Sequence, residues 1–145
     1  MHTDTDTRIN RYLEQAMIRL EKLQENEQTP FGKKKDKAAD AMIEKEYTGY
    51  TASLGATIVQ CGLLPAIYLY SQTDGQGKDK TSLLDIIFEL IKKDAANDDK
   101  ECKSLLGYVR KYGSKLSTER HITDAIIALK LAMRTFPIDK NSQPS

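Results

Sequence analysis

The chain has 145 residues, of which 39% are hydrophobic and 30% are charged, and its formal net charge is +1. This length suits one domain with one buried core. The near balance of charge excludes a uniformly basic protein, so an anionic partner is expected only at local basic patches.

A first helix is expected over residues 6–28, where apolar residues recur at the spacing of one helix face. That face consists of Ile9, Tyr12, Leu13, Ala16, Met17, Leu20 and Leu23. Pro30 and Gly32 interrupt helical propagation and end it. A second helix is expected from the lysine cluster toward Tyr47. The cluster consists of Lys33, Lys34, Lys35 and Lys37.

Residues 48–73 carry no charge. A membrane span is disfavoured because polar side chains, glycines and Pro65 interrupt the stretch, and lipid leaves freed backbone groups unpaired. A strand pair is disfavoured because apolar residues lie four apart on both sides of Gly62. Two helices joined at Gly62 fit, since glycine suits the position beyond a helix end and Pro65 falls in the next first turn. The stretch is either a buried hairpin or a hairpin that is partly covered by a partner.

A polar loop is expected over residues 71–80. The helix behind it has Ser82 as its expected N-cap, with Asp85 at the position of a capping-box acid. A second polar connection spans residues 94–101. The helical pattern then continues through Leu105, Leu106, Val109 and Tyr112.

The last helix has Ser117 or Thr118 as its expected N-cap, and Pro137 ends it. Its core-facing residues are Ile122, Ala125, Ile126, Leu129, Ala132, Met133 and Phe136. Ile127 and Leu131 lie on a flank, so the apolar arc is wider than one packing face requires.

The helical pattern along the chain predicts an all-α fold, a single compact helical bundle of about six helices. One domain is expected over residues 1–145, with residues 1–6 and 137–145 as flexible tails. Cys61 and Cys102 form no Cys-x-x-Cys pair, and the polar, acidic start MHTDTDTR is no signal peptide. These features predict a reduced, cytoplasmic protein.

No set of residues suited to catalysis assembles in the sequence. The histidines are His2 and His121, and a lone histidine at a helix start is more often a surface or partly packed residue than a catalytic base. The segment DGQGKDK lacks the spacing of a phosphate loop, and no spacing suits zinc. The acids Asp94, Asp98 and Asp99 resemble a solvated loop rather than a calcium site. No catalytic residue, metal site, cofactor or small-molecule substrate is expected.

Local basic patches are the remaining chemical signal. Residues 101–136 carry seven bases against three acids, whereas residues 1–28 carry four bases against six acids. Phosphate contacts read charge rather than sequence, so such patches suit an RNA backbone. Asp36 and Asp40 lie beside the lysine cluster, however, and charged runs usually only keep a surface hydrated.

The segment TASLGATIVQCGLLPAIYLY, preceded by Tyr47 and Tyr50, resembles the signature of the small helical subunit of the type III-B CRISPR effector, the Cmr RNA-targeting complex. In that family a tyrosine-bearing helix leads to an Ile-x-x-Asn-Gly-Leu turn and an apolar helix. The residues that match this pattern in order are Ile58, Gly62, Leu63 and Ala66. The opening helix and the closing segment TDAIIALKLAMRTF are also similar, so the resemblance covers residues 8–136. The sequence departs from the pattern at Cys61, Pro65 and Leu131.

The resemblance implies a non-catalytic structural subunit of the Cmr ribonucleoprotein, stacked in several copies beside the backbone subunits. The copies would help form a basic channel for target RNA, while guide pairing supplies sequence specificity. The implied partners are the other Cmr subunits, copies of the chain itself, guide RNA and target RNA, with no membrane. The expected RNA contacts are Lys33, Lys34, Lys35, Lys37, Lys45, Arg110, Lys111 and Arg134. The expected protein-interface residues are Leu64, Tyr68, Ile127 and Leu131.

Two other functions stay open at this point. A helical protein–protein adaptor would use its charges only for solubility and would make no RNA contact. A small nuclease would use Asp94, Asp98 and Asp99 with a metal ion.

Overall fold

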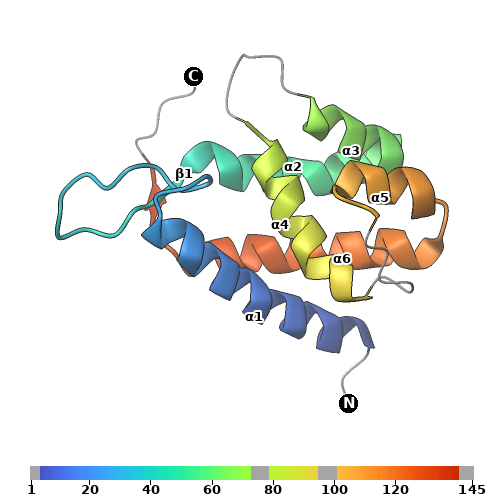
Figure 1. Ribbon diagram of the computed structural model, residues 1–145, viewed down its shortest axis with the longest axis horizontal. Coiled ribbons are helices and arrows are strands. Elements are labelled where there is room, and N and C mark those ends of the chain that lie inside the picture. The colour runs from blue at the N-terminus through green and yellow to red at the C-terminus, as the bar shows by residue number, and fades with distance from the viewer. Residues whose placement is uncertain (1–3, 73–78, 95–100, 141–145) are drawn as a thin grey trace.

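Helix α6 (Leu116–Met133) is the element against which three other helices pack. Its buried residues include adjacent ones, at 124–126, 128–129 and 132–133. The buried arc is therefore wider than the single stripe of a surface helix, and α6 contacts neighbours on more than one side. Helix α1 (Asp4–Glu25) runs along α6, and α2 (Lys45–Cys61) and α4 (Thr81–Ile91) also contact it (Figure 1). The buried residues of α6 include Ile122, Ala125, Ile126, Leu129, Ala132 and Met133.

The structure is a computed structural model that describes residues 4–72, 79–94 and 101–140. Within these ranges the other helices are α3 (Leu63–Ser71), α5 (Leu105–Tyr112) and the 3-10 helix η1 (Lys92–Asp94). Two short strands, β1 (Ile43–Glu44) and β2 (Ile138–Asp139), complete the described elements. The predicted all-α bundle of about six helices is confirmed. None of the described helices is long and apolar enough to cross a membrane.

Helix α1 ends before the predicted boundary at residue 28. The backbone N–H of Gln28 donates to the carbonyl of Leu23, and the N–H of Glu27 donates to the carbonyl of Gln24. Glu27 has a φ of 51°, and this pair of bonds with a left-handed residue closes a helix C-terminus. The helix is therefore closed by its own backbone before Pro30 is reached.

The predicted second helix, from the lysine cluster toward Tyr47, is wrong. Residues 32–42 form no helix, and β1 follows them. β1 pairs in parallel with β2, so that Ile43 lies opposite Ile138. Residues 138 and 139, which the sequence places in a tail, are thus hydrogen-bonded to the segment before α2.

Burial explains why this segment is a strand. Ala41 and Ile43 are fully buried, while Met42 between them is only partly buried, and a two-residue alternation is typical of a strand. The N–H of Ile43 donates to the carbonyl of Pro137 at 2.8 Å. Pairing with a segment far along the chain overrides the local helix preference.

The uncharged stretch forms two helices, α2 and α3, joined at Gly62 as predicted. Gly62 has φ 96° and ψ 165°, a region that essentially only glycine occupies. Its N–H donates to the carbonyl of Ile58 at 2.9 Å, which closes α2. Pro65 lies in the first turn of α3, again as predicted.

Substitution of Gly62 by Ala is expected to lower the free energy of unfolding by about 1–3 kcal/mol, because a Cβ strains this backbone conformation. Gly49→Ala is the matched control. Gly49 lies exposed within α2, and nothing lies within 4 Å of an added Cβ, so alanine there should raise the unfolding free energy by about 0.5–1 kcal/mol. Urea unfolding of both variants measures this, and an equal response at the two glycines would contradict the assigned strain.

The predicted N-cap of α4 is wrong. α4 begins at Thr81, so Ser82 lies inside its first turn. The carboxylate of Asp79 instead accepts hydrogen bonds from the backbone N–H of Thr81 at 2.9 Å and from its hydroxyl at 2.6 Å. This upstream acid thus satisfies the backbone N–H of Thr81, and the helix starts before the predicted capping box of Ser82 and Asp85.

The predicted N-caps of α6, Ser117 and Thr118, are also wrong. α6 begins at Leu116, and Thr118 is buried within it. The cap that the sequence reading missed is Ser104, whose hydroxyl accepts a hydrogen bond from the N–H of Gly107 at 3.1 Å and begins α5. A Ser three residues before a Gly is a weak signal, because both residues also favour loops.

Candidate nucleic-acid and protein interfaces

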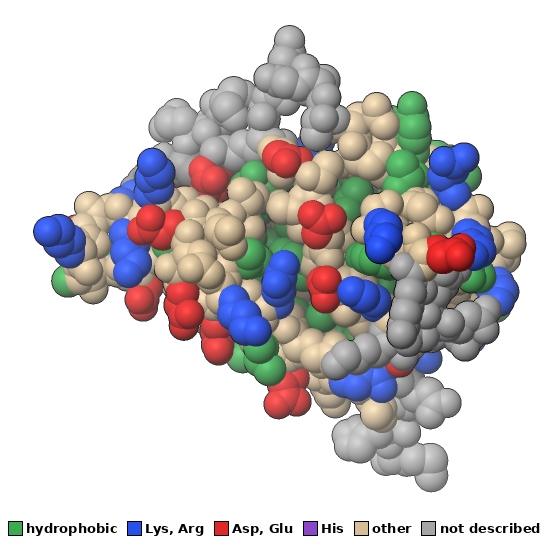
Figure 2. All heavy atoms as spheres, in the orientation of Figure 1, with side chains coloured by type: hydrophobic (Ala, Val, Ile, Leu, Met, Phe, Trp, Pro, Cys, Tyr) green, Lys and Arg blue, Asp and Glu red, His purple; other side chains and the backbone are tan. Residues whose placement is uncertain are grey.

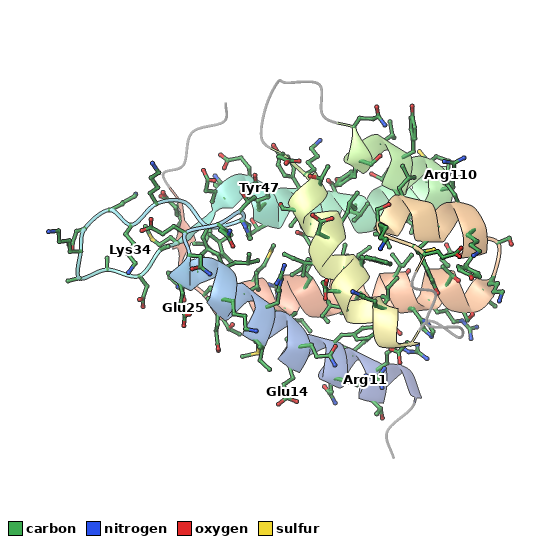
Figure 3. The ribbon with its side chains drawn as sticks, viewed as in Figure 1. Arg11, Glu14, Glu25, Lys34, Tyr47 and Arg110 are labelled. Carbon is green, nitrogen blue, oxygen red and sulfur yellow. The ribbon has the colours of Figure 1, made fainter. Side chains whose placement is uncertain are left out.

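The basic residues predicted to contact RNA lie in two separate parts of the molecule. The loop group consists of Lys33, Lys34, Lys35 and Lys37 in the segment before β1. The α5 group consists of Arg110, Lys111 and the neighbouring Lys115. Figure 3 shows Lys34 and Arg110 near opposite ends of the long axis. The fold does not bring the two groups together within one chain.

Backbone and side-chain contacts hold the loop group in place. The N–H of Gly32 donates to the carbonyl of Met42 at 3.0 Å, and the N–H of Lys34 donates to the carboxylate of Glu27 at 3.1 Å. Lys35 forms an ion pair with Asp139 at 3.2 Å. All four lysines are exposed, so their charges face solvent while the loop ends are anchored.

Two further predicted contacts lie near the loop group. Lys45 is the first residue of α2, directly after β1, and Arg134 follows the last residue of α6. Both are exposed. The ring of Phe136 packs edge-on against Phe31 with centroids 5.5 Å apart, which joins the end of α6 to the base of the loop. Lys45 and Arg134 therefore belong to the loop end of the molecule.

Aromatic packing positions the α5 group. The ring of Tyr108 is buried against Phe88 and Tyr112, with centroids 6.2 and 5.0 Å away. The ammonium groups of Lys111 and Lys115 lie 5.4 and 5.3 Å from the centre of the Tyr112 ring. Such cation–π contacts hold a long side chain in place. Arg110 and Lys111 also lie in the last turn of α5, where the helix dipole favours positive charge.

The outer edge of α1 has the opposite charge. Glu14, Glu21 and Glu25 are exposed along one stripe of this helix, and Figure 2 shows acidic side chains along the lower left edge of the molecule, with basic side chains also over the middle of the same face. Arg19 and Lys22 are exposed on α1 as well. An acidic stripe repels an RNA backbone, so RNA is disfavoured at the stripe itself.

The predicted protein-interface residues are exposed on two helices. On α3, Leu64 is 45% exposed and Tyr68 is 53% exposed, while Ile127 and Leu131 on α6 are each 39% exposed. Within each pair the residues lie four apart, so each pair forms a short stripe on one helix face.

Two exposed apolar residues of the uncharged stretch were missed as interface candidates. Val59 on α2 is 87% exposed and Leu69 on α3 is 56% exposed. Both belong to the uncharged stretch, whose other apolar residues are mostly buried. The buried members are Leu54, Ile58, Leu63, Ala66, Ile67 and Tyr70. A hairpin cannot bury adjacent apolar residues such as Ile58 and Val59 on one face, and that spacing was the available signal.

A group of charged residues joins α1, α6 and η1. Arg8 donates to the carboxylate of Asp124 at 2.7 Å, and both side chains are largely buried, at 20% and 8% exposure. Arg11 and the hydroxyl of Tyr12 both donate to the carboxylate of Asp94. These bonds tie the first turns of α1 to α6 and to the end of η1.

The pKa of two groups in this region is shifted. Burial, followed by the hydrogen bond to Asp94, raises the pKa of Tyr12 above its usual value. Burial, followed by the positive charge of Arg8, lowers the pKa of His121. His121 is therefore a partly packed, mostly neutral side chain at neutral pH, and its position on α6 next to Arg8 follows from the packing of α1 on α6.

The nuclease alternative gains no support from the described residues. Asp94 is engaged by Arg11 and Tyr12, while Asp98 and Asp99 lie outside the described residues. Within residues 4–72, 79–94 and 101–140, no group of three or more His, Cys, Asp or Glu side chains is placed to hold a metal ion.

Comparison with known proteins identifies one family. A family model described as CRISPR-associated protein (Cas_Cmr5) matches residues 12–136 of the chain. No curated protein and no solved structure matches the chain. The matched region extends from α1 to just beyond α6 and includes the α2–α3 hairpin.

Proposed function

The chain belongs to the Cas_Cmr5 family, the small helical subunit of the type III-B Cmr complex, and from this premise we propose that its copies stack head to tail and help line a basic channel for target RNA. The observation that carries the proposal is the position of the loop group and the α5 group near opposite ends of one molecule (Figure 3). In a head-to-tail stack, the loop group of one copy lies beside the α5 group of the next. The basic residues of the two groups then form one continuous row along the stack.

This subunit contributes charge and shape to RNA binding, with no catalytic group of its own. Lysine and arginine contacts to phosphates carry no sequence information, and pairing with the guide supplies it. The acidic edge of α1 faces away from the RNA. Guide RNA and the backbone subunits of the Cmr complex are the further partners of the stack.

The exposed apolar stripes supply the contacts between neighbours. When the α3 stripe of one copy contacts the α6 stripe of the next copy without the reciprocal contact, the interface is heterologous and can repeat along an open stack. Apolar side chains 39–53% exposed in the single chain lose most of this exposure when a neighbour covers them. Burial of that surface stabilises the stack.

Replacement of Leu64 and Tyr68 by Asp is expected to lower the number of copies of this subunit in each assembled complex, because two buried charges would oppose the contact. Native mass spectrometry of the purified complex counts the copies. Ile18→Asp is the control, since Ile18 is 51% exposed on α1 and outside both stripes. An unchanged copy number in the α3 variant would remove this face from the interface.

A further inference from the structure

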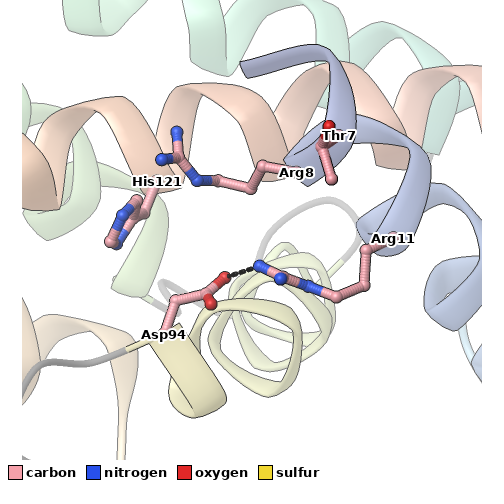
Figure 4. A pocket seen from close by; sticks show the side chains of 5 residues that line it. All are labelled: Thr7, Arg8, Arg11, Asp94 and His121. Carbon is pink, nitrogen blue, oxygen red and sulfur yellow. Dashed lines mark hydrogen bonds and ion pairs between the residues drawn. The ribbon is translucent and has the colours of Figure 1, made fainter. Parts of the chain in front are cut away.

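A small hollow lies where the first turns of α1 meet α6 and η1. It has a volume of about 290 Å³ and is lined by Thr7, Arg8, Arg11, Asp94 and His121 (Figure 4). Pockets for drug-sized ligands span about 300–1,000 Å³. This hollow lies just below the lower end of that range and therefore suits a small ligand.

Hydrogen-bond donors outnumber acceptors around the hollow. Each guanidinium offers five N–H groups, and in the described residues Arg8 uses donors on Asp124 and Arg11 uses donors on Asp94. Thr7 adds a hydroxyl and His121 adds a ring N–H. Among the described lining residues, Asp94 is the one acidic side chain. Two guanidinium groups, each paired with a carboxylate, and the His121 ring thus border one space, while the hydroxyl of Thr7 lies on its outer side (Figure 4).

The depths of the two arginines differ. The ion pair of Arg8 with Asp124 is largely buried, whereas the side chain of Arg11 is 47% exposed and lies on the solvent side of the hollow. Figure 4 shows Arg8 directed toward His121 and Arg11 directed toward Asp94, with the hollow between them. Arg11 can move from Asp94 to a ligand without exposing a buried charge.

We propose that this hollow binds a phosphate group, held by Arg11 and Arg8 with a hydrogen bond from His121. Guanidinium groups match the geometry of phosphate oxygens. The site shares no residue with the loop group or the α5 group, so it goes beyond the proposed channel and does not depend on it.

The source of the phosphate is either inorganic phosphate or the terminal phosphate of an oligoribonucleotide, and the chemistry is the same for both. Burial and the positive charges of Arg8 and Arg11 oppose protonation of His121, whereas the carboxylates of Asp94 and Asp124 favour it. A bound anion adds a further negative charge that favours the protonated form. Occupation of the hollow therefore raises the pKa of His121.

Titration calorimetry of the full chain with inorganic phosphate tests the proposal. Arg11→Gln is expected to weaken binding about tenfold, the effect of losing one charge-assisted hydrogen bond. Asp94→Asn is expected to tighten binding, because it removes the negative charge beside the ligand. Lys22→Gln, which removes an exposed charge elsewhere on α1, should leave the affinity unchanged. Circular dichroism confirms that each variant is folded.

A second readout separates the ligand from a purely structural role of these residues. The NMR signals of His121 should shift toward the protonated form on addition of phosphate to the unmodified chain and not to Arg11→Gln. A 5′-phosphorylated oligoribonucleotide that binds more tightly than its 5′-hydroxyl counterpart, with the difference lost in Arg11→Gln, identifies an RNA end as the source. Equal binding of the two, with inorganic phosphate still bound, identifies free phosphate. No phosphate binding, or equal binding by Arg11→Gln, overturns the site.

Discussion

Removal of two positive charges at either basic end is expected to flatten the salt dependence of target-RNA binding by the assembled complex. Each phosphate contact to a single strand contributes about 0.7 to the slope of log affinity against log salt. A pair of substitutions therefore changes the slope by about 1.4 per copy of the contact. The two pairs are Arg110→Gln with Lys111→Gln in the α5 group and Lys33→Gln with Lys34→Gln in the loop group.

The combination of both pairs distinguishes a continuous basic row from a single binding end. If the basic residues of the two ends form one continuous RNA-binding row, the changes in slope caused by the two pairs should add to about 2.8 in the fourfold variant. Arg19→Gln with Lys22→Gln is the control, because it removes the same charge from exposed positions on α1. An effect at one end only would restrict the channel to that end. If neither pair differs from the control, the chain is an adaptor without RNA contact.

Replacement of Asp124 by Ala is expected to lower the free energy of unfolding by about 2–3 kcal/mol, because it leaves the charge of Arg8 without its partner in a largely buried site. The partner bond is 2.7 Å long, and the carboxylate side chain is only 8% exposed. α1 lies against α6 at this point, so the substitution weakens the largest helix contact in the bundle. Urea unfolding monitored by circular dichroism measures the loss.

The double replacement Arg8→Met with Asp124→Leu separates charge from packing. Because it removes both ions together, it should recover most of the stability lost in Asp124→Ala. Lys35→Gln is the comparison at an exposed pair, since Lys35 is 56% exposed in its ion pair with Asp139, and its effect should stay below about 1 kcal/mol. A double variant no more stable than Asp124→Ala would mean that the loss arises from packing rather than from the unpaired charge.

The helices of the bundle follow from local pattern. The apolar spacing that forms α1, α4 and α6 involves residues within one or two helical turns of each other. Gly62 and Pro65, which end α2 and begin α3, likewise act on neighbouring residues. The boundaries were less accurate. The start of α4 depends on the side chain of Asp79, which accepts a hydrogen bond from Thr81. The end of α1 depends on the backbone conformation of Glu27. Apolar periodicity encodes neither feature.

The segment before α2 shows what local pattern misses. Lysines and alanines there favour a helix, yet Ile43 pairs with Ile138 near the other end of the chain. The same holds for the charged residues of the hollow. Arg8, Asp94 and His121 come from three elements, and each by itself reads as an ordinary surface or capping residue.

The all-α class, the hinge at Gly62, the likeness to the Cmr small subunit and the local basic clusters can all be recognised from residues close together in the chain. Periodicity, glycine and proline act within a few residues, so these features need no knowledge of the fold. Three other features emerge only from the packing of the helices: which apolar residues stay exposed, the position of the loop group and the α5 group at opposite ends, and the hollow that Arg8, Arg11, Asp94 and His121 border. Those facts depend on how helices far apart in the chain pack on α6, because distances between elements are set by the core they share.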